Sequence, residues 1–262
     1  MKVGLKGILA TSAAAAAIFA GAQVALADGM PGGPGYAVGP GLWNGAYIGF
    51  ESGWEWDSTR VDFLSAPGEK SHWDRDVVNV GFFGGYQHQF GPLVIGVELN
   101  LIGNEFDQTS RMAPTTPHGG NCPNTLLNCI GRITNEITVG PRLGYAVGRF
   151  MPYVTGGWAT GEVQFKSIAG PGIPGVAQGT TTTEADARQN GFYVGGGLDW
   201  KLSRNAVVGI EYRHTDLGSA DTHFFFTTSA GSPEPIRQHA ESDAVLLRGS
   251  LLFGGRDYEP LK

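Results

Sequence analysis

The chain has 262 residues, and its composition combines 42 glycines with 11% aromatic residues and only 16% charged residues. The formal net charge is −6 and the basic residues form no cluster, which excludes nucleic acid as a partner. Glycine weakens helices and adds no volume to a core, so this composition is unusual for a soluble enzyme and indicates that small residues are needed beside large rings.

The first 27 residues have the features of a secretory signal peptide. Two lysines precede a weakly apolar stretch that reaches about residue 22, and an Ala-Leu-Ala cleavage motif ends at residue 27. We therefore expect residues 1–27 to be removed on export. A transmembrane anchor is the alternative, but the stretch is short and rich in alanine. The glycine- and proline-rich segment 28–42 is then expected to be a flexible periplasmic lead-in.

Two cysteines, Cys122 and Cys129, stand in a polar stretch with six residues between them. Because exported chains enter oxidising compartments, we expect a local disulfide between them. A zinc site would need more ligands nearby than the sequence offers. The histidines of the long connections also lack a short metal-binding spacing, so we expect neither a metal nor a cofactor. These histidines are His72, His118, His223 and His239.

From residue 43 onward, apolar side chains recur at every second position, which is the period of a β-strand. The alternation predicts eight strands, at residues 44–56, 78–90, 93–102, 132–147, 152–165, 190–202, 206–215 and 243–253. The connections are alternately short and long, and the long polar ones cover residues 57–76, 103–131, 166–189 and 216–242. Phe83, Val94 and Ile102 are exceptions to the alternation. Pro141 lies inside the fourth strand and cannot donate a ladder hydrogen bond, so we expect a bulge or a local break there.

The stretch Gly195-Gly196-Gly197 raises the question of a phosphate-binding loop. Such a loop requires the N-terminus of a helix directly after the glycines. The alternation continues instead through Asp199 and Lys201. We therefore assign the three glycines to a strand, in which Gly195 and Gly197 point inward and leave space for charged side chains.

Three features favour a membrane barrel over a soluble β-sandwich, which would show the same alternation. Charged residues flanked by glycine occur in mid-strand, where they would face a narrow interior and need partners of opposite sign. Aromatic residues gather near the strand ends, as in the interfacial girdles of membrane barrels. These residues are Trp43, Trp54, Trp56, Tyr86, Phe90, Tyr145, Trp200 and Phe253. Finally, an even number of strands with alternating short turns and long loops is the layout of an outer-membrane barrel.

We therefore predict an all-β fold, an eight-stranded antiparallel up-and-down transmembrane β-barrel over residues 43–253, with four long outer loops and short periplasmic turns. Its inward charges are the candidate site: Glu51, Glu98, Glu136, Arg142, Asp199, Lys201, Glu211, Arg213 and Arg248. In one interpretation they form a plug of ion pairs, and in the other they line a narrow pore. Eight strands enclose only enough space for side chains, which favours the plug.

Some small outer-membrane barrels are enzymes, and His214, Asp216 and Ser219 superficially provide a Ser-His-Asp set. Their sequence spacing does not establish the geometry of a triad, and the alternation places His214 on the lipid face. We therefore predict that the protein is not an enzyme.

Four segments of the chain carry a resemblance to a known family. They read WNGAYIGFESGW at residues 43–54, RLGYAVGRFMPYVTGGWA at 142–159, GFYVGGGLDWKLSRNAVVGIEYRHTDLG at 191–218 and VLLRGSLLF at 245–253. They resemble the small outer-membrane β-barrel proteins of alphaproteobacteria, the porin-family and outer-membrane-immunogenic-protein group. The resemblance covers residues 43–253 and implies an outer-membrane location, contact with membrane lipid and lipopolysaccharide, and insertion by the barrel assembly machinery.

In this family the last strand usually ends the chain at an aromatic residue that acts as an assembly signal. Phe253 matches that position, although a C-terminal tail of residues 254–262 follows it. The family implies structural, surface-antigen or porin roles and supplies no catalytic residues.

We expect a non-enzymatic outer-membrane barrel with an envelope-structural role, whose surface loops are available to host molecules or phage. The alternative is a narrow passive channel for ions or small solutes. A third hypothesis, an exported soluble barrel that binds a ligand inside, is disfavoured because ligand pockets are mostly apolar, whereas this interior is polar and rich in glycine.

Overall fold

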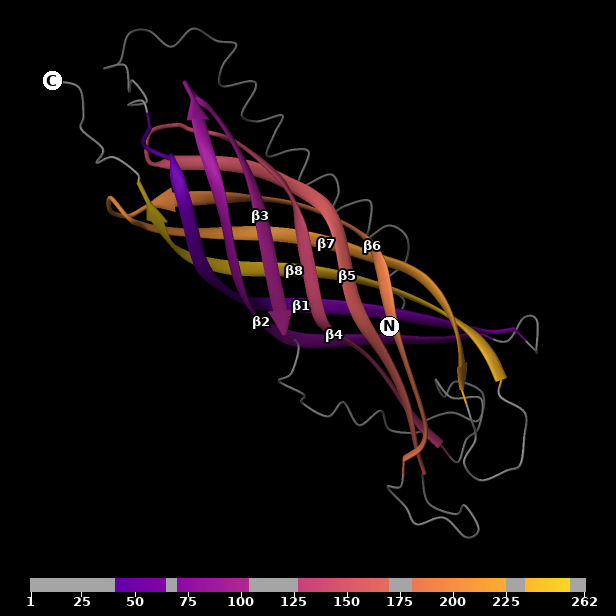
Figure 1. The fold of residues 1–262 in the computed structure, drawn as a ribbon. Helices are drawn as coiled ribbons and strands as arrows, with labels where there is room; N and C mark the ends of the chain where they lie inside the picture. Colours follow the sequence, from indigo (N-terminus) through magenta and orange to yellow (C-terminus); the bar gives the residue numbers. More distant parts are fainter. Residues whose placement is uncertain (1–40, 65–69, 104–126, 170–180, 225–233, 255–262) are drawn as a thin grey trace, which may run out of the picture. The chain divides into compact units, whose positions relative to one another are not determined.

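The computed structural model describes residues 41–64, 70–103, 127–169, 181–224 and 234–254. They form eight antiparallel strands in chain order, which close into a barrel where β8 pairs with β1 (Figure 1). The strands are β1 (Gly45–Phe63), β2 (Lys70–Phe90), β3 (Leu93–Gly103), β4 (Leu127–Tyr145), β5 (Phe150–Ala169), β6 (Thr181–Lys201), β7 (Ala206–Phe224) and β8 (Glu234–Phe253). The fold class predicted from the sequence is confirmed.

The predicted signal peptide, residues 28–40 of the lead-in and residues 255–262 of the tail lie outside the described residues. Within the described ranges, no helix is long and apolar enough to cross a membrane.

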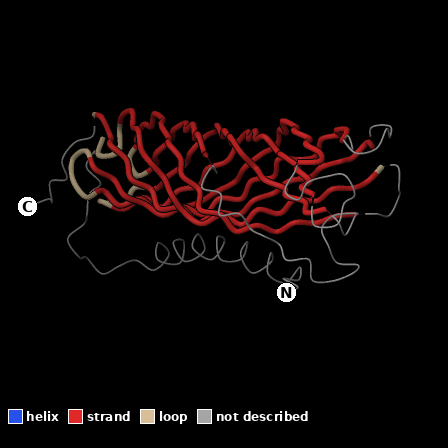
Figure 2. The backbone as a smooth tube through the Cα atoms, turned by 90° about the horizontal axis from the view of Figure 1, so that it is seen from below, coloured by secondary structure: helices blue, strands red, loops and turns tan. Residues whose placement is uncertain are grey.

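The short connections, at residues 91–92, 146–149 and 202–205, lie together at one end of the barrel (Figure 2). We call this the proximal end and the opposite one the distal end. The strands reach further toward the distal end than the sequence predicted, since β1 continues to Phe63 and β6 begins at Thr181. Both faces of these extensions carry mainly polar residues, so the apolar alternation that marks a strand is missing there. Strand residues therefore occupy more than half of three predicted long loops, at 57–76, 166–189 and 216–242, and residues 103 and 127–131 of the fourth.

The barrel wall is continuous at the proximal end and divides toward the distal end. β3 stops at Gly103 opposite Val80, and the pairing of β6 with β7 stops at Phe192 opposite Asp216. Beyond these points, the described strands form two separate sheets, β4-β5-β6 and β7-β8-β1-β2, which we call the distal sheets. Figure 1 shows the distal ends of β1 and β2 well apart from those of β4 and β5.

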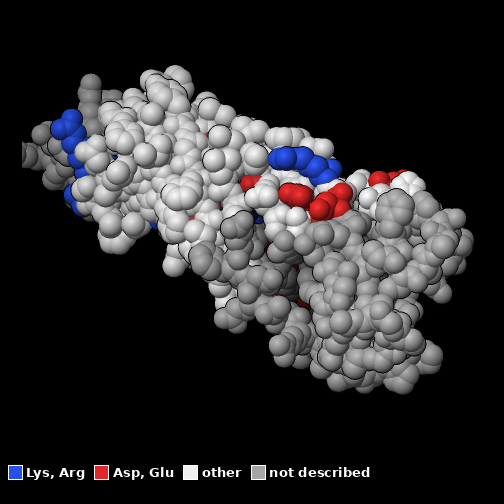
Figure 3. All heavy atoms as spheres, turned by 60° about the horizontal axis from the view of Figure 1, so that its bottom comes forward, with Lys and Arg blue, Asp and Glu red and all other residues white. Residues whose placement is uncertain are grey.

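Outward side chains form an uncharged belt, the apolar band, around the proximal part of the barrel. It covers residues 46–56, 78–90, 93–101, 137–145, 150–158, 192–200, 206–212 and 245–253, whose outward positions include no Asp, Glu, Lys or Arg. Large side chains are exposed on it, among them Phe82 and Leu247 at 65% and 69%. On the face shown in Figure 3, charged atoms lie at either end of an uncharged surface. Tilted strand segments of about 10 residues match the thickness of a bilayer core, so the apolar band spans a membrane.

A β-bulge in β4 changes which side chains face inward. The pairing with β5 shifts between Thr134 and Ile137, where Asn135 has a φ of 51°, in the left-handed region. As a result Ile133 is fully buried inside the barrel, whereas a simple alternation over residues 132–147 predicts that it shares the outward face of Ile137 and Val139. That prediction was wrong because an extra residue reverses the parity of the strand.

Pro141 interrupts the β4 ladder without causing the bulge. It is paired with Val97 of β3, and the register with β5 is the same on both sides of it. In the described part of β4, Gly140 and Pro141 are the positions that lack a ladder partner on β5 inside this constant register. The Thr155 hydroxyl donates a 3.1 Å hydrogen bond to the Pro141 carbonyl and bridges this local break.

Candidate functional site

All nine charged residues singled out in the sequence point into the barrel, and none is more than 6% exposed. Seven of them form one connected set of ion pairs, which we call the ion-pair network. Its members are Glu51 of β1, Glu98 of β3, Arg142 of β4, Asp199 of β6, Glu211 and Arg213 of β7, and Arg248 of β8. The other two, Glu136 and Lys201, lie toward the distal and proximal ends.

Arg248 occupies the centre of the ion-pair network. Its Nη2 lies 2.7 Å from Glu98 Oε1, and its Nε lies 3.3 Å from Glu51 Oε2. Its Nη1 contacts Glu211 Oε2. These carboxylates come from three strands, and β3 is not a neighbour of β8 in the sheet, so the guanidinium joins opposite parts of the wall across the lumen.

Arg213 contacts two of the three carboxylates that Arg248 contacts. It lies 2.9 Å from Glu51 Oε1 and 2.7 Å from Glu211 Oε1. It also donates a 3.3 Å hydrogen bond to Asn100 Oδ1 on β3. Glu51 and Glu211 each therefore contact both Arg213 and Arg248.

Arg142 approaches the same centre from β4. Its Nη2 lies 2.7 Å from Asp199 Oδ2, and its Nη1 lies 3.7 Å from Glu98 Oε2. The guanidinium carbon is 3.7 Å from the centre of the Tyr153 ring, a distance at which the cation is attracted to the ring face. Three cations and four carboxylates thus share one layer of the lumen. Their positive and negative charges nearly balance.

Two tyrosine rings lie over inward glycines of the neighbouring strand. Tyr47 is opposite Gly85 in the β1–β2 ladder, and Tyr153 is opposite Gly197 in the β5–β6 ladder. A Cβ atom would lie 2.6 Å from the hydroxyl oxygen of Tyr47 at Gly85, and 2.7 Å from that of Tyr153 at Gly197. Glycine is needed at both positions because any side chain would collide with a ring. The space at Gly197 is therefore occupied by a tyrosine, whereas the sequence predicted a charged side chain there.

The hydroxyl groups of these tyrosines continue the ion-pair network. Tyr47 donates a 2.9 Å hydrogen bond to Glu98, and Tyr153 donates a 2.7 Å hydrogen bond to Glu211. Sequence reasoning missed both residues. Tyr47 shares the inward parity of Glu51, which could have identified it, whereas glycines on both faces of β5 hid the parity of Tyr153.

The two halves of the barrel supply the same residue types in the same strand order. Each half provides a tyrosine, a glycine opposite it, a glutamate that accepts the tyrosine hydrogen bond, and an arginine. The sets are Tyr47, Gly85, Glu98 and Arg142 in β1 to β4, and Tyr153, Gly197, Glu211 and Arg248 in β5 to β8. The centre of the barrel is therefore built on an approximate internal two-fold repeat.

Glu136 lies on the distal side of this layer, beside the β4 bulge. It accepts a 3.0 Å hydrogen bond from the Thr215 hydroxyl. Nearby in the lumen, Asn79 donates a 2.8 Å hydrogen bond to Glu55, a buried carboxylate that the sequence analysis did not include in the candidate site. These two hydrogen bonds thus join four buried polar side chains of the distal lumen.

Apolar side chains close the proximal mouth. Trp43, predicted as part of the outer girdle, is instead fully buried, and its Nε1 donates a 3.3 Å hydrogen bond to the Gly148 carbonyl. Leu42, predicted to belong to the flexible lead-in, is buried beside it. The Lys201 ammonium donates to the Leu42 carbonyl and lies 5.9 Å from the Trp43 ring centre. The apolar cluster also contains Tyr47, Phe83, Val94, Ala146, Met151, Val207 and Leu252.

The residues considered as a catalytic set do not converge. His214 Nδ1 lies 2.9 Å from Asp243 Oδ1. Asp216 accepts a hydrogen bond from the Gly218 N–H, while Ser219 Oγ lies 3.3 Å from Nδ1 of His239. His214 and Asp243 lie just distal to the apolar band and face outward. The hydrogen bond between them raises the pKa of His214 above its usual value near 6.5.

Several predictions concern residues or side chains that the structure does not describe. Cys122 and His118 are not among the described residues, and the side chains of Cys129 in β4 and His72 in β2 are not described either. The disulfide therefore stays a prediction. Among the described side chains, no group of three His, Cys, Asp or Glu residues is arranged to hold a metal ion.

Comparison with known proteins places the sequence among outer-membrane proteins. A family model described as outer membrane protein beta-barrel domain matches residues 11–231. The 31 kDa outer-membrane immunogenic protein of Brucella melitensis is 30% identical over 185 residues, covering 67% of this chain and 72% of that protein. The 22 kDa outer membrane protein of Rhizobium leguminosarum is 27% identical over 183 residues, covering 69% and 67%.

The solved structures that align with this chain include outer-membrane proteins. The outer membrane protein OprG of Pseudomonas aeruginosa superposes with a TM-score of 0.48 at 12% identity, covering 81% of this chain and 98% of that one.

Proposed function

Because the chain belongs to the outer membrane protein β-barrel family, we propose that it is a non-enzymatic envelope protein with a structural role, whose distal strands and loops form an exposed antigenic and interaction surface. The protein is an outer-membrane β-barrel. The proposal concerns what that barrel does, and it follows from how the lumen and the distal end are built.

The filled lumen is the observation that carries the structural role. The ion-pair network crosses the barrel in mid-membrane, and the apolar cluster around Trp43 closes the proximal mouth. A continuous water path would require both layers to open. Opening the central layer would separate buried opposite charges, which is costly in a low-dielectric interior. This arrangement supports a rigid barrel rather than the alternative of a passive channel.

The distal end supports the surface role. In β8 the apolar band covers residues 245–253, yet the strand begins at Glu234, so about half of it extends beyond the membrane. Apart from Pro235, the described outward residues of this part are polar or charged, as in the exposed ion pair of Arg237 with Asp221 at 2.6 Å. The Brucella relatives are named immunogenic proteins, which agrees with a surface that antibodies, host molecules or phage can reach.

Single-channel recording tests the closed lumen. Mature protein refolded into a planar lipid bilayer should give no current steps above those of the bare bilayer. Heat-modifiable migration on a gel verifies in parallel that the inserted protein is folded. Discrete, reproducible steps from folded protein would contradict the structural role and favour the channel.

Cysteine labelling of intact cells tests the exposed surface. Ser219→Cys, on the exposed distal part of β7, should react with a membrane-impermeant maleimide before the cells are opened. Asn205→Cys, in a proximal turn, should react only after the outer membrane is permeabilised. The unsubstituted protein measures the background from Cys122 and Cys129. The reverse pattern would show that the barrel has the opposite orientation.

A further inference from the structure

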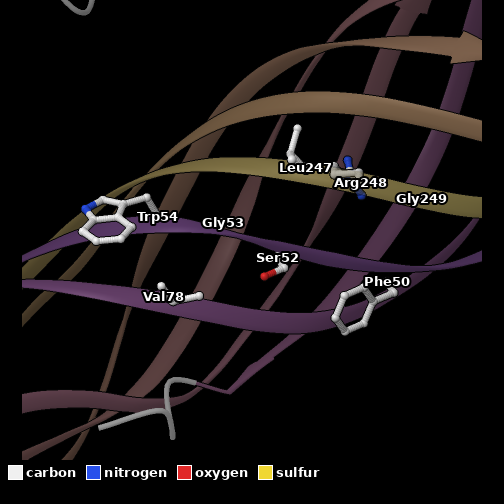
Figure 4. Close-up of a pocket in the computed structure, with 8 residues that line it drawn as sticks. All are labelled: Phe50, Ser52, Gly53, Trp54, Val78, Leu247, Arg248 and Gly249. Carbon is white, nitrogen blue, oxygen red and sulfur yellow. The ribbon is translucent and has the colours of Figure 1, made fainter. Parts of the chain in front are cut away.

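A groove of about 530 Å³ opens on the outside of the barrel between β8, β1 and β2. Figure 4 shows Phe50 and Trp54 at its two ends with Ser52 between them. In the β1–β8 ladder, Gly249 is opposite Phe50 and Leu247 is opposite Ser52. The groove is therefore a gap in the apolar band, produced where two small residues interrupt rows of large ones.

The floor of the groove is open because Gly249 carries no side chain. A Cβ atom at Gly249 would meet no other atom within 4 Å. The flanking side chains project far from the wall, since Phe50, Trp54 and Leu247 are 45%, 48% and 69% exposed. The groove thus has small residues at its floor, and large aromatic and aliphatic side chains form its sides.

No charged or unsatisfied side chain of the lining faces the groove. The Ser52 hydroxyl donates a 3.0 Å hydrogen bond to the Asn79 carbonyl. Arg248 contributes its backbone, because its guanidinium is inside the barrel with Glu98 and Glu211. An occupant therefore gains dispersion contacts but finds no hydrogen-bond partner, which excludes sugars, phosphate and an extended peptide backbone.

The groove lies in the distal half of the apolar band. It uses residues 50–54 of the band segment 46–56 and residues 247–249 of the segment 245–253. With the short turns in the periplasm, an orientation that rests on the proposed function, this half faces the outer leaflet. In the outer membrane that leaflet holds lipopolysaccharide.

We infer that the groove binds one acyl chain of an outer-leaflet glycolipid. The groove is continuous with the lipid-facing surface, so the surrounding bilayer must fill it or leave a void, and a void forfeits the contacts of every atom that lines it. A flexible hydrocarbon chain adapts to the groove by rotation about its own bonds. A second copy of the protein would need a rigid, complementary projection at the same depth.

Lipid retention measures this occupancy. Folded protein is reconstituted in vesicles of phosphatidylethanolamine with deep-rough lipopolysaccharide, or of phosphatidylethanolamine alone, and bound lipid is counted by native mass spectrometry. We expect one retained glycolipid per chain in the first vesicles. Gly249→Leu fills the floor and should abolish the retention. Gly196→Leu is the matched control, because Gly196 also faces lipid and a Cβ there makes only ordinary contacts, at 3.4 and 3.8 Å.

Equal retention by Gly249→Leu, or no retained lipid on the unsubstituted protein, would overturn the inference. Retention of phosphatidylethanolamine in place of glycolipid would overturn the assignment to the outer leaflet. A dimer that Gly249→Leu dissociates would assign the groove to a second copy. None of these outcomes changes the conductance result, so the proposed function stands or fails separately.

Photo-crosslinking in intact cells gives a second reading that does not depend on filling the groove. A benzophenone amino acid replaces Phe50 at the groove or Phe192 on β6, two outward residues that are 45% and 50% exposed. Crosslinking to lipopolysaccharide should be clearly higher at position 50. Equal yields at the two positions would mean that the groove holds no preferred chain.

Discussion

At the scale of single residues, Arg248 shows how strongly this interior depends on individual charges. It contacts three carboxylates that are themselves almost fully buried. Arg248→Met keeps much of the side-chain volume but removes the cation, and Arg213 alone cannot replace it beside Glu98. Removing one partner of a buried ion pair typically costs about 3–5 kcal/mol. We expect a loss of this size in the free energy of unfolding, measured by urea titration of the barrel in lipid vesicles.

The control for this prediction is an arginine in an exposed ion pair. Arg237 contacts Asp221 at 2.6 Å on the distal surface, where both side chains are about half exposed. Arg237→Met should leave the urea midpoint unchanged, because exposed ion pairs contribute little. If both variants unfold at the same urea concentration, the ion-pair network does not stabilise the barrel.

Gly197 and Gly196 are adjacent glycines with opposite roles. Gly197 faces inward against the Tyr153 ring and the carbonyl of Ile210, whereas Gly196 faces lipid with ordinary contacts. Gly197→Ala should destabilise the barrel by about 1–3 kcal/mol, the usual effect of overpacking a core. Gly196→Ala should have little effect. A heat-modifiability melt of both variants measures the difference, and similar melting temperatures would contradict the close packing of Tyr153 on this strand.

His214 provides a pH-dependent contact at the distal edge of the apolar band. Because its hydrogen bond to Asp243 raises its pKa in the folded state, the contact stabilises the fold at acid pH, and the contribution is lost as the pH rises through that pKa. Asp243→Asn should lower the pKa of His214 toward 6.5. An NMR titration of the imidazole signals checks this shift. A pKa that does not fall in Asp243→Asn would exclude the hydrogen bond as its cause.

At the scale of strands, the sequence predicted the membrane-spanning segments well and their distal extensions poorly. Within the apolar band, lipid outside and a largely polar lumen inside impose an alternation that few residues interrupt, so β3 was predicted within one residue of its observed end although Val94 and Ile102 depart from the pattern. Beyond the band, both faces meet polar surroundings and the alternation disappears. The β4 bulge at Asn135 was not predicted either, because one extra residue in a strand does not change the composition of the sequence in a recognisable way.

Because the wall divides into two distal sheets, we expect the backbone amides of β5 and β6 to differ in their protection from hydrogen exchange. In sheet β4-β5-β6, the distal part of β5 is paired on both sides, whereas residues 181–191 of β6 are paired with β5 alone. Amides of β6 that point toward β7 should therefore exchange faster than those of β5 at the same height. Hydrogen–deuterium exchange read by mass spectrometry on peptides from the two strands checks this. Equal protection would mean that β6 and β7 also pair beyond Phe192.

At the scale of the whole molecule, the lumen is stratified along the barrel axis. An apolar cluster closes the proximal end, charged residues occupy the middle, and polar side chains with a second apolar cluster around Ile133 and Leu217 lie distally. Alternation alone identified the charged layer, because an ionisable residue at inward parity is conspicuous in the sequence. The apolar closure by Trp43 escaped prediction because that residue precedes the first strand, where parity gives no information.

The end of β8, the strand that closes the barrel, leads to a prediction about how the barrel is assembled. Phe253 is the last residue of β8, is 49% exposed on the apolar band, and pairs with Ala46 of β1. If the assembly machinery recognises the aromatic end of the closing strand, Phe253→Ala should reduce the amount of heat-modifiable barrel in the outer membrane. Deletion of residues 254–262 should not, because it leaves that strand end intact. Leu251→Ala is the matched control, since Leu251 faces lipid in the same strand at 51% exposure. A tail deletion that impairs assembly as strongly as Phe253→Ala would show that the signal extends beyond the barrel into the C-terminal tail.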